Sequence, residues 1–201
     1  MSSAISARRG LNCARYLTIF PMLRPALFLD RDGVVNRSPG PGYVLSIADF
    51  HLNPGIIELL AWAKSQGYFL VLVTSQQGVG KGLMSMLDLE CIHAYLQSLL
   101  APHHATFDLI QVCPHLASTC DCRKPSPTLI HQAAALLPID LTRSVLIGDH
   151  DRDIQMAENA HLPYTIRVAT ENPIHHPAHF TARTIPEAFS ALKAWHLTAG
   201  V

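Results

Sequence analysis

Short apolar runs that alternate with helix-forming segments constrain the fold of this chain more than any other feature. The apolar runs occupy residues 26–29, 68–74, 107–113, 144–148 and 164–168. Helix signals lie at residues 53–67, 85–100, 154–160 and 185–195, and a further helix begins near residue 126. Strands buried on both faces of a parallel sheet are continuous apolar runs, and helices connect them. We therefore predict a single α/β domain of the Rossmann-like, doubly wound type, with helices on both faces of a parallel sheet.

Capping residues indicate where two of the helices begin and end. Asn53 is expected to be the N-cap of the first helix, and Gly67 to end it. Ser85 and Asp88 have the spacing of a capping box, which predicts the start of the second helix.

Two segments between the predicted strands and helices have the composition of loops. Residues 38–50 are rich in glycine and proline and are expected to form a short flap over the end of the first strand. Residues 75–82, SQQGVGKG, are expected to form a polar loop. Since neither segment is long enough for a large cap domain, we expect a site that accepts a small molecule.

The first apolar run stops abruptly at Asp30 and Asp32, which flank one arginine. Gly33 allows a turn at this point, so both carboxylates would lie at the carboxyl end of a buried strand, where open α/β sheets bind their ligands. The alternative is a turn in which the aspartates only form local hydrogen bonds, and for an isolated Asp-x-Asp pattern this alternative is the commoner one.

Polar side chains follow the other strands at the same edge of the predicted sheet. Thr74 and Ser75 end the second strand, Asp149 follows the fourth, and Lys124 comes after the third and a loop. With Asp30 they combine carboxylates that can hold a hard divalent cation, hydroxyl donors and an ammonium group. Such a set suits a phosphate group and Mg²⁺, with the ion bridging carboxylate and phosphoryl oxygens.

The aspartates of residues 149–153 could also open a calcium-binding loop. That loop requires glycine at its sixth position and a bidentate acid at its last, but Ile154 and Ala160 stand there. We therefore interpret Asp149 as a magnesium ligand, Asp153 as a residue that supports it, and Asp151 as solvated.

The loop after the third strand carries a second pattern of metal-binding residues. Cys113, His115, Cys120 and Cys122 supply within ten residues the ligands of a closed, structural tetrahedral zinc site. A disulfide is the alternative, but it would leave the histidine and part of the cysteines without a role. Cys91 lies outside this set, and on a predicted helix it is expected to belong to the core.

The first residues differ in composition from the rest of the chain. Residues 1–24 contain no acidic residue and several arginines, which is compatible with a transit peptide. An extension upstream of a start at Met22 explains the composition equally well. We expect this segment to be weakly ordered and the domain to comprise residues 25–201.

Charge and hydropathy limit the partners of the protein. Lys plus Arg and Asp plus Glu number 15 each, so the net charge is zero and a nucleic-acid or membrane surface is not favoured. No apolar run approaches the roughly 18 residues of a membrane span. We expect a cytoplasmic, monomeric protein whose partner is a small-molecule phosphate ester.

Four segments, in order along the chain, together resemble the motifs of a known family. FLDRDGVVN, LVTSQQG, CRKP and LIGDHDRDI resemble the motifs of the haloacid-dehalogenase phosphatase superfamily. DRDGVVN together with CPHLASTCDCRKP is similar to its zinc-loop subgroup, which includes D-glycero-D-manno-heptose 1,7-bisphosphate 7-phosphatases and histidinol-phosphate phosphatases. The resemblance covers the chain from residue 27 to the last helix.

This resemblance implies a role for each residue of the site. Asp30 would be the nucleophile that forms an aspartyl-phosphate, and Asp32 the general acid and base. Thr74 and Lys124 would hold the phosphoryl oxygens. Mg²⁺ would bind to Asp30, Asp149 and the backbone carbonyl of Asp32.

The substrate is indicated less clearly than the reaction. GYVLSIADFHLNPG and GVGKG look like segments of heptose bisphosphate phosphatases, whereas the short CPHLASTCDC loop looks like that of histidinol phosphatases. Ser75, Gln76 and Arg123 are the candidate substrate-binding residues. A non-catalytic zinc-bearing binding module is the alternative from another functional class.

Overall fold

A parallel β-sheet forms the centre of the computed structural model, which describes residues 22–200. Its strands run in the order β3-β2-β1-β4-β5-β6, and every neighbouring pair is parallel. The strands are β1 (Ala26–Leu29), β2 (Phe69–Ser75), β3 (Leu109–Cys113), β4 (Val145–Gly148), β5 (Tyr164–Val168) and β6 (Phe180–Ala182). This strand order is that of a Rossmann-like fold, so the predicted fold class is confirmed.

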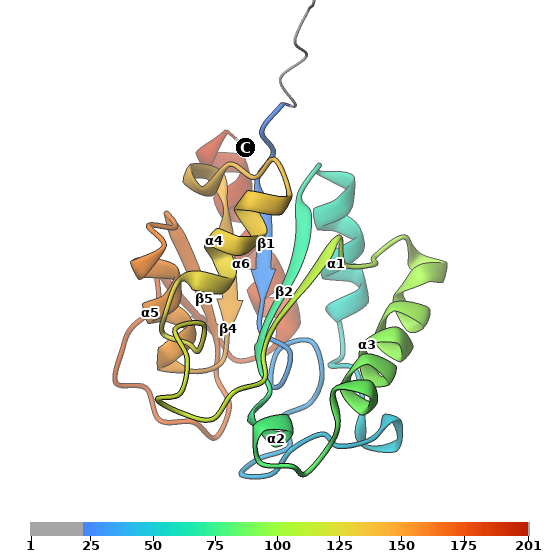
Figure 1. The fold of residues 1–201 in the computed structure, drawn as a ribbon. Coiled ribbons are helices and arrows are strands. Elements are labelled where there is room, and N and C mark those ends of the chain that lie inside the picture. The colour runs from blue at the N-terminus through green and yellow to red at the C-terminus, as the bar shows by residue number, and fades with distance from the viewer. Residues whose placement is uncertain (1–21, 201) are drawn as a thin grey trace, which may run out of the picture.

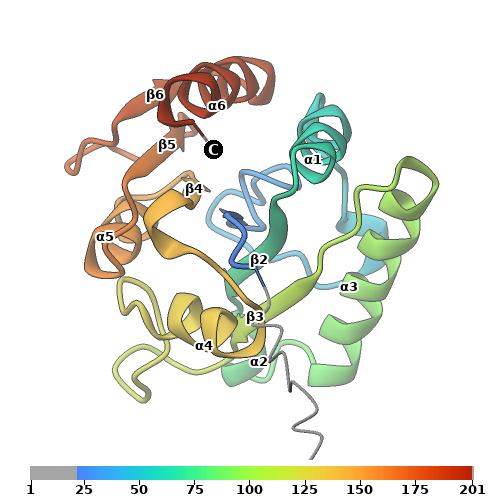
Figure 2. The same cartoon turned by 90° about the horizontal axis from the view of Figure 1, so that it is seen from above.

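Helices cover both faces of the sheet, as Figures 1 and 2 show. Residues of α1, α3 and α6 share one buried apolar cluster, and residues of α4 and α5 share the other. The helices are α1 (Ile56–Ser65), α2 (Gln77–Gly80), α3 (Met86–Leu100), α4 (Thr128–Leu136), α5 (Asp151–Asn159) and α6 (Ile185–Ala199). Short 3₁₀ turns lie at Ile47–Asp49, Ala101–His103 and Leu141–Arg143.

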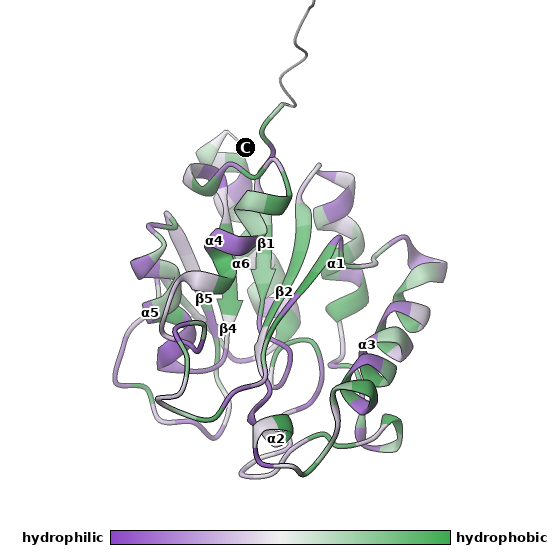
Figure 3. Ribbon diagram, in the orientation of Figure 1, coloured by the Kyte–Doolittle hydropathy of each residue, from purple (hydrophilic) through white to green (hydrophobic). Residues whose placement is uncertain are grey.

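The central strand shows why the sheet is buried on both faces. Successive side chains of a strand point to opposite faces, so Ala26 and Phe28 enter one apolar cluster while Leu27 and Leu29 enter the other. All of them are fully buried. Each large side chain contributes about 1.5–3 kcal/mol to stability through this burial. Figure 3 shows the same pattern, with hydrophobic strands inside a more polar shell of helices and loops.

The chain adds strands on one side of β1 and then, from β4 onward, on the other side. The boundary between β1 and β4 is therefore the point of the sheet where a ligand is expected to bind. Connections from β1 lead to β2 and β3 on one side, whereas β4 lies on its other side. The backbone N–H of Asp30 donates to Ile147 O at 3.0 Å, so the ends of β1 and β4 stay together. A crevice at the carboxyl ends of such strands is where α/β proteins bind ligands. These ends point toward the lower part of Figure 1.

The flap of residues 38–50 is anchored to the core rather than freely exposed. Val44 and Phe50 are only 2% and 3% exposed and belong to the larger apolar cluster. Tyr43 lies against α2, where a Cβ on Gly78 would be 3.5 Å from its ring. The flap therefore has a defined position over the carboxyl ends of the strands.

The start of α1 differs from the prediction, whereas the start of α3 agrees with it. The N-cap of α1 is Gly55, not Asn53. The Asn53 amide instead donates to the carbonyl oxygens of Gly33, Val34 and Asn36, so it holds the turn after β1. The predicted capping box before α3 is confirmed, since Ser85 and Asp88 each bind the other's backbone N–H.

Two elements, α2 and β6, were not predicted. Residues 75–82 contain the short helix α2 instead of forming only a loop. The strand β6 has three residues and pairs with the edge of β5. None of the helices that the structure describes has the length and apolar character needed to cross a membrane.

Arg24 joins the N-terminal end of the described chain to the domain. Its Nε donates to Gly67 O at 2.7 Å, and its guanidinium lies 4.2 Å from the centre of the Phe69 ring. The backbone also pairs with Ile139. The packed part of the domain thus begins no later than Arg24, while most of the segment expected to be weakly ordered, residues 1–21, lies outside the described residues.

Candidate active site

Asp30 ends β1 at the base of the site and lies beside a buried ammonium group. The Lys124 Nζ atom is 2.7 Å from Asp30 Oδ1 and 2.7 Å from Asp153 Oδ1. Burial raises the pKa of Asp30 to about 6, against the opposing effect of Lys124. Burial works to lower the pKa of Lys124, but the two carboxylates hold this pKa above its usual value. The lysine therefore stays charged where it can neutralise an anion.

Asp149 follows β4 and faces Asp30 across the crevice. Burial, together with the charges of Asp30 and Asp153, raises the pKa of Asp149 to about 7. Its Oδ2 accepts hydrogen bonds from Asn172 at 2.9 Å and from Thr170 at 3.2 Å.

The carboxylates of Asp30, Asp149 and Asp153 form a group that suits a hard cation. One oxygen of each lies within 4.8 Å of the others, and all three residues are buried. Three carboxylates crowded at this distance and balanced by one ammonium group match the ligands that Mg²⁺ prefers. The residues present thus fit a divalent cation.

The two aspartates in the first turn of α5, Asp151 and Asp153, have different surroundings. Asp153 is fully buried, and its Oδ2 accepts from the backbone N–H of Asp149 and of His150. Asp151 is paired with the buried Arg167 and also accepts from the N–H of His175. The expectation that Asp151 is solvated is therefore wrong, because a buried arginine on β5 supplies its partner.

Several donors hold the carboxylate of Asp32 in place. The Arg31 guanidinium contacts it through Nε at 3.1 Å and Nη2 at 3.0 Å. The amides of Asn36 and Gln76 each donate to it at 2.9 Å. Gln76 also donates to Thr74 Oγ1 at 2.8 Å. The orientation of Asp32 is therefore set by the protein before any substrate binds.

A cavity of about 120 Å³ opens over these groups. A larger hollow of about 370 Å³ adjoins it across Ser38, on the side of β5 and α6. Residues from five loops line the smaller cavity: Asp30, Asp32, Ser38, Pro39, Gly40, Gly42, Tyr43, Thr74, Ser75, Lys124, Asp149, Arg152 and Asn172. All the proposed catalytic residues are among them, whereas Gln76 and Arg123 are not.

Unpartnered polar atoms mark where a ligand would be bound. In the part of the chain that the structure describes, Ser75 Oγ and Arg152 Nε are buried and have no hydrogen-bond partner, and both residues line the smaller cavity. Arg123 also has such an atom, Nη1, but outside the cavity lining. Since buried donors without partners cost stability, Ser75 and Arg152 are candidates to donate hydrogen bonds to an anionic ligand.

Sequence reasoning missed Arg31, Arg152, Thr170 and Asn172 as residues of the site. The last two follow β5 at the same edge as Asp149, so the rule of strand ends could have found them. Arg152 could not be found by this rule, because it lies in the first turn of α5 and not at the end of a strand. Its approach to the cavity depends on the residue at which α5 begins.

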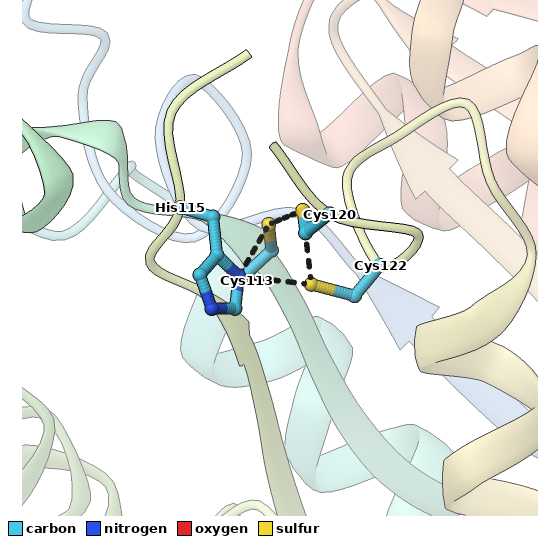
Figure 4. A group of neighbouring side chains, drawn as sticks. All are labelled: Cys113, His115, Cys120 and Cys122. Atoms are coloured by element: carbon cyan, nitrogen blue, oxygen red, sulfur yellow. Dashed lines mark hydrogen bonds between the residues drawn. The ribbon is translucent and has the colours of Figure 1, made fainter. Parts of the chain in front are cut away.

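Four metal-ligand side chains converge in the loop after β3, as Figure 4 shows. The Cys120 Sγ atom is 3.5 Å from Cys113 Sγ and 3.4 Å from Cys122 Sγ. His115 Nδ1 lies 3.3 Å from Cys122 Sγ and 3.9 Å from Cys113 Sγ. Sulfur atoms this far apart are not disulfide-bonded, since that bond is about 2.05 Å long. Ligands of a tetrahedral zinc ion are about 3.5–3.8 Å apart, so the set fits zinc.

The same loop packs tightly on α2. A Cβ on Gly80 would lie 2.8 Å from Pro114 O and 3.0 Å from Leu116 N. The loop of the Cys/His cluster and the segment after Thr74 therefore support one another. The expectation of a buried Cys91 is wrong, because this cysteine lies on the exposed side of α3.

Comparisons with known proteins agree with this geometry. A family described as HAD-hydrolase-like matches residues 121–187. The D-glycero-β-D-manno-heptose-1,7-bisphosphate 7-phosphatase of Helicobacter pylori strain J99 is 42% identical over 154 residues, which cover 76% of this chain and 87% of that protein. The D-glycero-α-D-manno-heptose-1,7-bisphosphate 7-phosphatase of Mycobacterium tuberculosis strain H37Rv is 42% identical over 135 residues, which cover 66% of this chain and 71% of that protein.

A solved structure shares the fold over most of this chain. The D,D-heptose 1,7-bisphosphate phosphatase of B. bronchiseptica, solved with magnesium and phosphate, is 27% identical and has a TM-score of 0.73. The similarity covers 85% of this chain and 98% of that one. Since the sequence identity to these phosphatases extends over most of the chain and the fold is shared, this protein belongs to the haloacid-dehalogenase-like hydrolase family and is a phosphatase.

Proposed function

We propose that this phosphatase removes the 7-phosphate of D-glycero-D-manno-heptose 1,7-bisphosphate through an aspartyl-phosphate on Asp30. The observation that carries the chemistry is the buried pair of Asp30 and Lys124 at the base of a cavity that Thr74 and Ser75 also line. The substrate is supported by the heptose bisphosphate phosphatases to which the chain is similar. The same geometry counts against a non-catalytic binding module, which has no need of a nucleophile beside an acid.

In the first step, a carboxylate oxygen of Asp30 attacks the phosphorus atom. The bond from phosphorus to the sugar oxygen breaks as the new bond forms, and Asp32 gives its proton to the departing oxygen. The hydroxyl of Thr74 and the ammonium group of Lys124 hold the phosphoryl oxygens while their charge shifts. Both residues line the cavity.

In the second step, water hydrolyses the aspartyl-phosphate. Asp32, now a carboxylate, takes a proton from this water, which attacks phosphorus and returns Asp30 to its free form. Arg31, Asn36 and Gln76 keep the Asp32 carboxylate in one orientation for both steps. The flap over the cavity limits the access of other water molecules.

Mg²⁺ would be held by Asp30, Asp149 and the backbone carbonyl of Asp32, with Asp153 beside them. When bound, it supplies positive charge to the phosphoryl oxygens and to the nucleophile. Zn²⁺ would be held by the four side chains of Figure 4, with a structural role. These four residues directly precede Arg123 and Lys124, so the proposed zinc site would fix the loop that presents the catalytic lysine.

The second phosphate of a bisphosphate needs a cation of its own. Lys124 is engaged by two carboxylates, whereas Arg152 lines the cavity and its Nε has no hydrogen-bond partner among the described residues. Arg152, together with Ser75, is therefore suited to bind a second anionic group. Arg123, which is adjacent to Lys124 in the sequence, is a further candidate for this role. Histidinol phosphate carries no second phosphate, so it would leave this charge unused.

Phosphate release from a small panel of substrates tests the proposal. Both anomers of the heptose 1,7-bisphosphate and histidinol phosphate are compared with Mg²⁺ present, for the wild type and for Asp30→Asn. We expect one heptose bisphosphate to give the highest kcat/KM with the wild type and no turnover with Asp30→Asn. Preference for histidinol phosphate would overturn the substrate, and equal activity of the two proteins would overturn the chemistry.

A further inference from the structure

His93 is a buried histidine that the chemistry described above does not use. It lies on α3, outside the lining of the smaller cavity, and is 7% exposed. Its Nε2 atom is 3.5 Å from Nη1 of Arg31. Arg31 is fully buried and stands between Asp30 and Asp32 in the sequence. This contact therefore links α3 to the centre of the site.

The buried guanidinium of Arg31 needs an acceptor on each side, because unpaired buried donors are costly, above all when they are charged. Its Nε and Nη2 groups donate to the carboxylate of Asp32, and Nη2 also donates to Gln76 Oε1 at 3.0 Å. For Nη1, His93 is the partner that the described part of the chain provides. Loss of the imidazole would leave this nitrogen without an acceptor.

The imidazole of His93 has the protonation state that this contact requires. Burial and, to a smaller extent, the charge of Arg31 lower the pKa of His93 to about 4. The ring is therefore neutral at neutral pH. An arginine donates only, so Nε2 is the acceptor and the proton of the ring lies on Nδ1.

We propose that His93 is a positioning residue for the acid/base of the reaction: it accepts a hydrogen bond from Arg31 and so fixes the guanidinium that orients the Asp32 carboxylate. The inference rests on the proposed role of Asp32. Misplacement of a general acid and base slows the chemical steps while substrate binding remains. His93→Leu should thus lower kcat by about tenfold and leave KM within about twofold, since general acid–base catalysis as a whole contributes about 10²–10⁴-fold.

Matched variants separate this role from a purely structural one. His93→Gln retains a carbonyl oxygen that can accept from Arg31, so it should recover most of the kcat that His93→Leu loses. Leu96→Ala removes a fully buried side chain from the same helix, and should lower Tm without lowering kcat. In an Asp32→Asn background, His93→Leu should have no further effect, because the group that it positions is already lost.

Kinetics with p-nitrophenyl phosphate and with heptose 1,7-bisphosphate, each with Mg²⁺, provide the measurement. An unchanged kcat for His93→Leu, an equal loss for His93→Gln, or a full additional loss in Asp32→Asn would each overturn the inference. Nitrogen-15 NMR of the His93 ring supplies a readout that needs no substrate. We expect an unprotonated Nε2 at neutral pH, and a protonated Nε2 would contradict the contact even if the proposed substrate were wrong.

Discussion

Gly33 shows at the scale of a single residue how tightly the site is built. Its φ is +86°, and a Cβ there would lie 2.4 Å from Asp149 Oδ2. Gly33→Ala should therefore displace the Asp149 carboxylate, and Mg²⁺-dependent activity should fall by about a hundredfold or more, as for other misplaced catalytic groups. Gly67→Ala is the matched control, with φ also +86° but nothing within 4 Å.

Both glycine variants carry the same backbone strain, about 1–2 kcal/mol. The backbone strain should lower the Tm of both variants by a similar amount. The rate of phosphate release, in contrast, should fall in Gly33→Ala and stay close to the wild-type rate in Gly67→Ala. If Gly33→Ala kept wild-type kcat and Mg²⁺ affinity, Asp149 would have no essential part in the site.

The carboxylates of the site predict how Mg²⁺ binding depends on pH. The pKa of Asp149 is raised to about 7 and that of Asp30 to about 6, so protons compete with the cation below these values. Mg²⁺ affinity should fall by about tenfold per pH unit for each displaced proton as the pH drops through this range.

The same carboxyl groups determine whether the stability of the metal-free protein rises or falls with pH. A carboxyl whose pKa is raised by folding lowers the stability of the metal-free protein as the pH rises from about 4 to about 7. The increase in Tm on adding Mg²⁺ should thus be larger above neutral pH than at pH values below the raised pKa of Asp30. Equal shifts at both pH values would contradict the proposed carboxylate site.

Arg152 is the residue whose replacement should alter substrate choice. Arg152→Gln should raise KM for the heptose bisphosphate by at least about tenfold, since a hydrogen bond to a charged group is worth about 1.5–3 kcal/mol. Hydrolysis of p-nitrophenyl phosphate, which has one phosphate, should change little. Arg143→Gln, just before β4 at the opposite edge of the sheet, serves as the control.

Two other outcomes for Arg152 have a clear meaning. An equal loss on both substrates would place this arginine at the phosphate that is cleaved. No loss on either substrate would remove it from the site.

At the scale of elements, the loop after β3 and the helix α2 act as one unit, because Gly80 lies directly against the backbone of that loop. Cys120→Ser should weaken Zn²⁺ binding, lower Tm and lower kcat/KM several-fold, while turnover with saturating Mg²⁺ is retained. The reason is that the loop presents Lys124, whereas the nucleophile Asp30 directly follows β1. Metal analysis and steady-state kinetics measure this, with the exposed Cys91→Ser as control.

Complete loss of turnover in a folded Cys120→Ser protein would contradict a purely structural role for this site. It would mean that the Cys/His cluster takes part in the chemistry itself.

Elements with strong local signals could be predicted from the sequence, and elements that depend on tertiary contacts could not. The strand β5 has the predicted bounds because its apolar run is continuous. The strand β6 has three residues and exists because β5 offers an open edge. Asn53 looked like an N-cap, but its amide binds three carbonyls of a turn that only the folded chain brings near.

At the scale of the whole molecule, topology explains why much of the site could be predicted. Asp30 and Asp149 directly follow strands of a parallel sheet and Thr74 lies near the end of one, so predicting the strands also brought these residues to one edge. Arg31 and His93 could not be paired in this way. Their contact joins the turn after β1 to the inner face of α3, and nothing in either segment encodes that distance.

Detection of the phosphoenzyme tests the central claim most directly. Wild-type protein is mixed with heptose 1,7-bisphosphate and Mg²⁺, quenched in acid during turnover and digested for mass spectrometry. The account predicts that the peptide with ALFLDRDGVVN gains the mass of one phosphoryl group, located on Asp30, and that Asp30→Asn shows no such gain. A phosphoryl group on another residue, or turnover by the wild type with no labelled peptide, would contradict it.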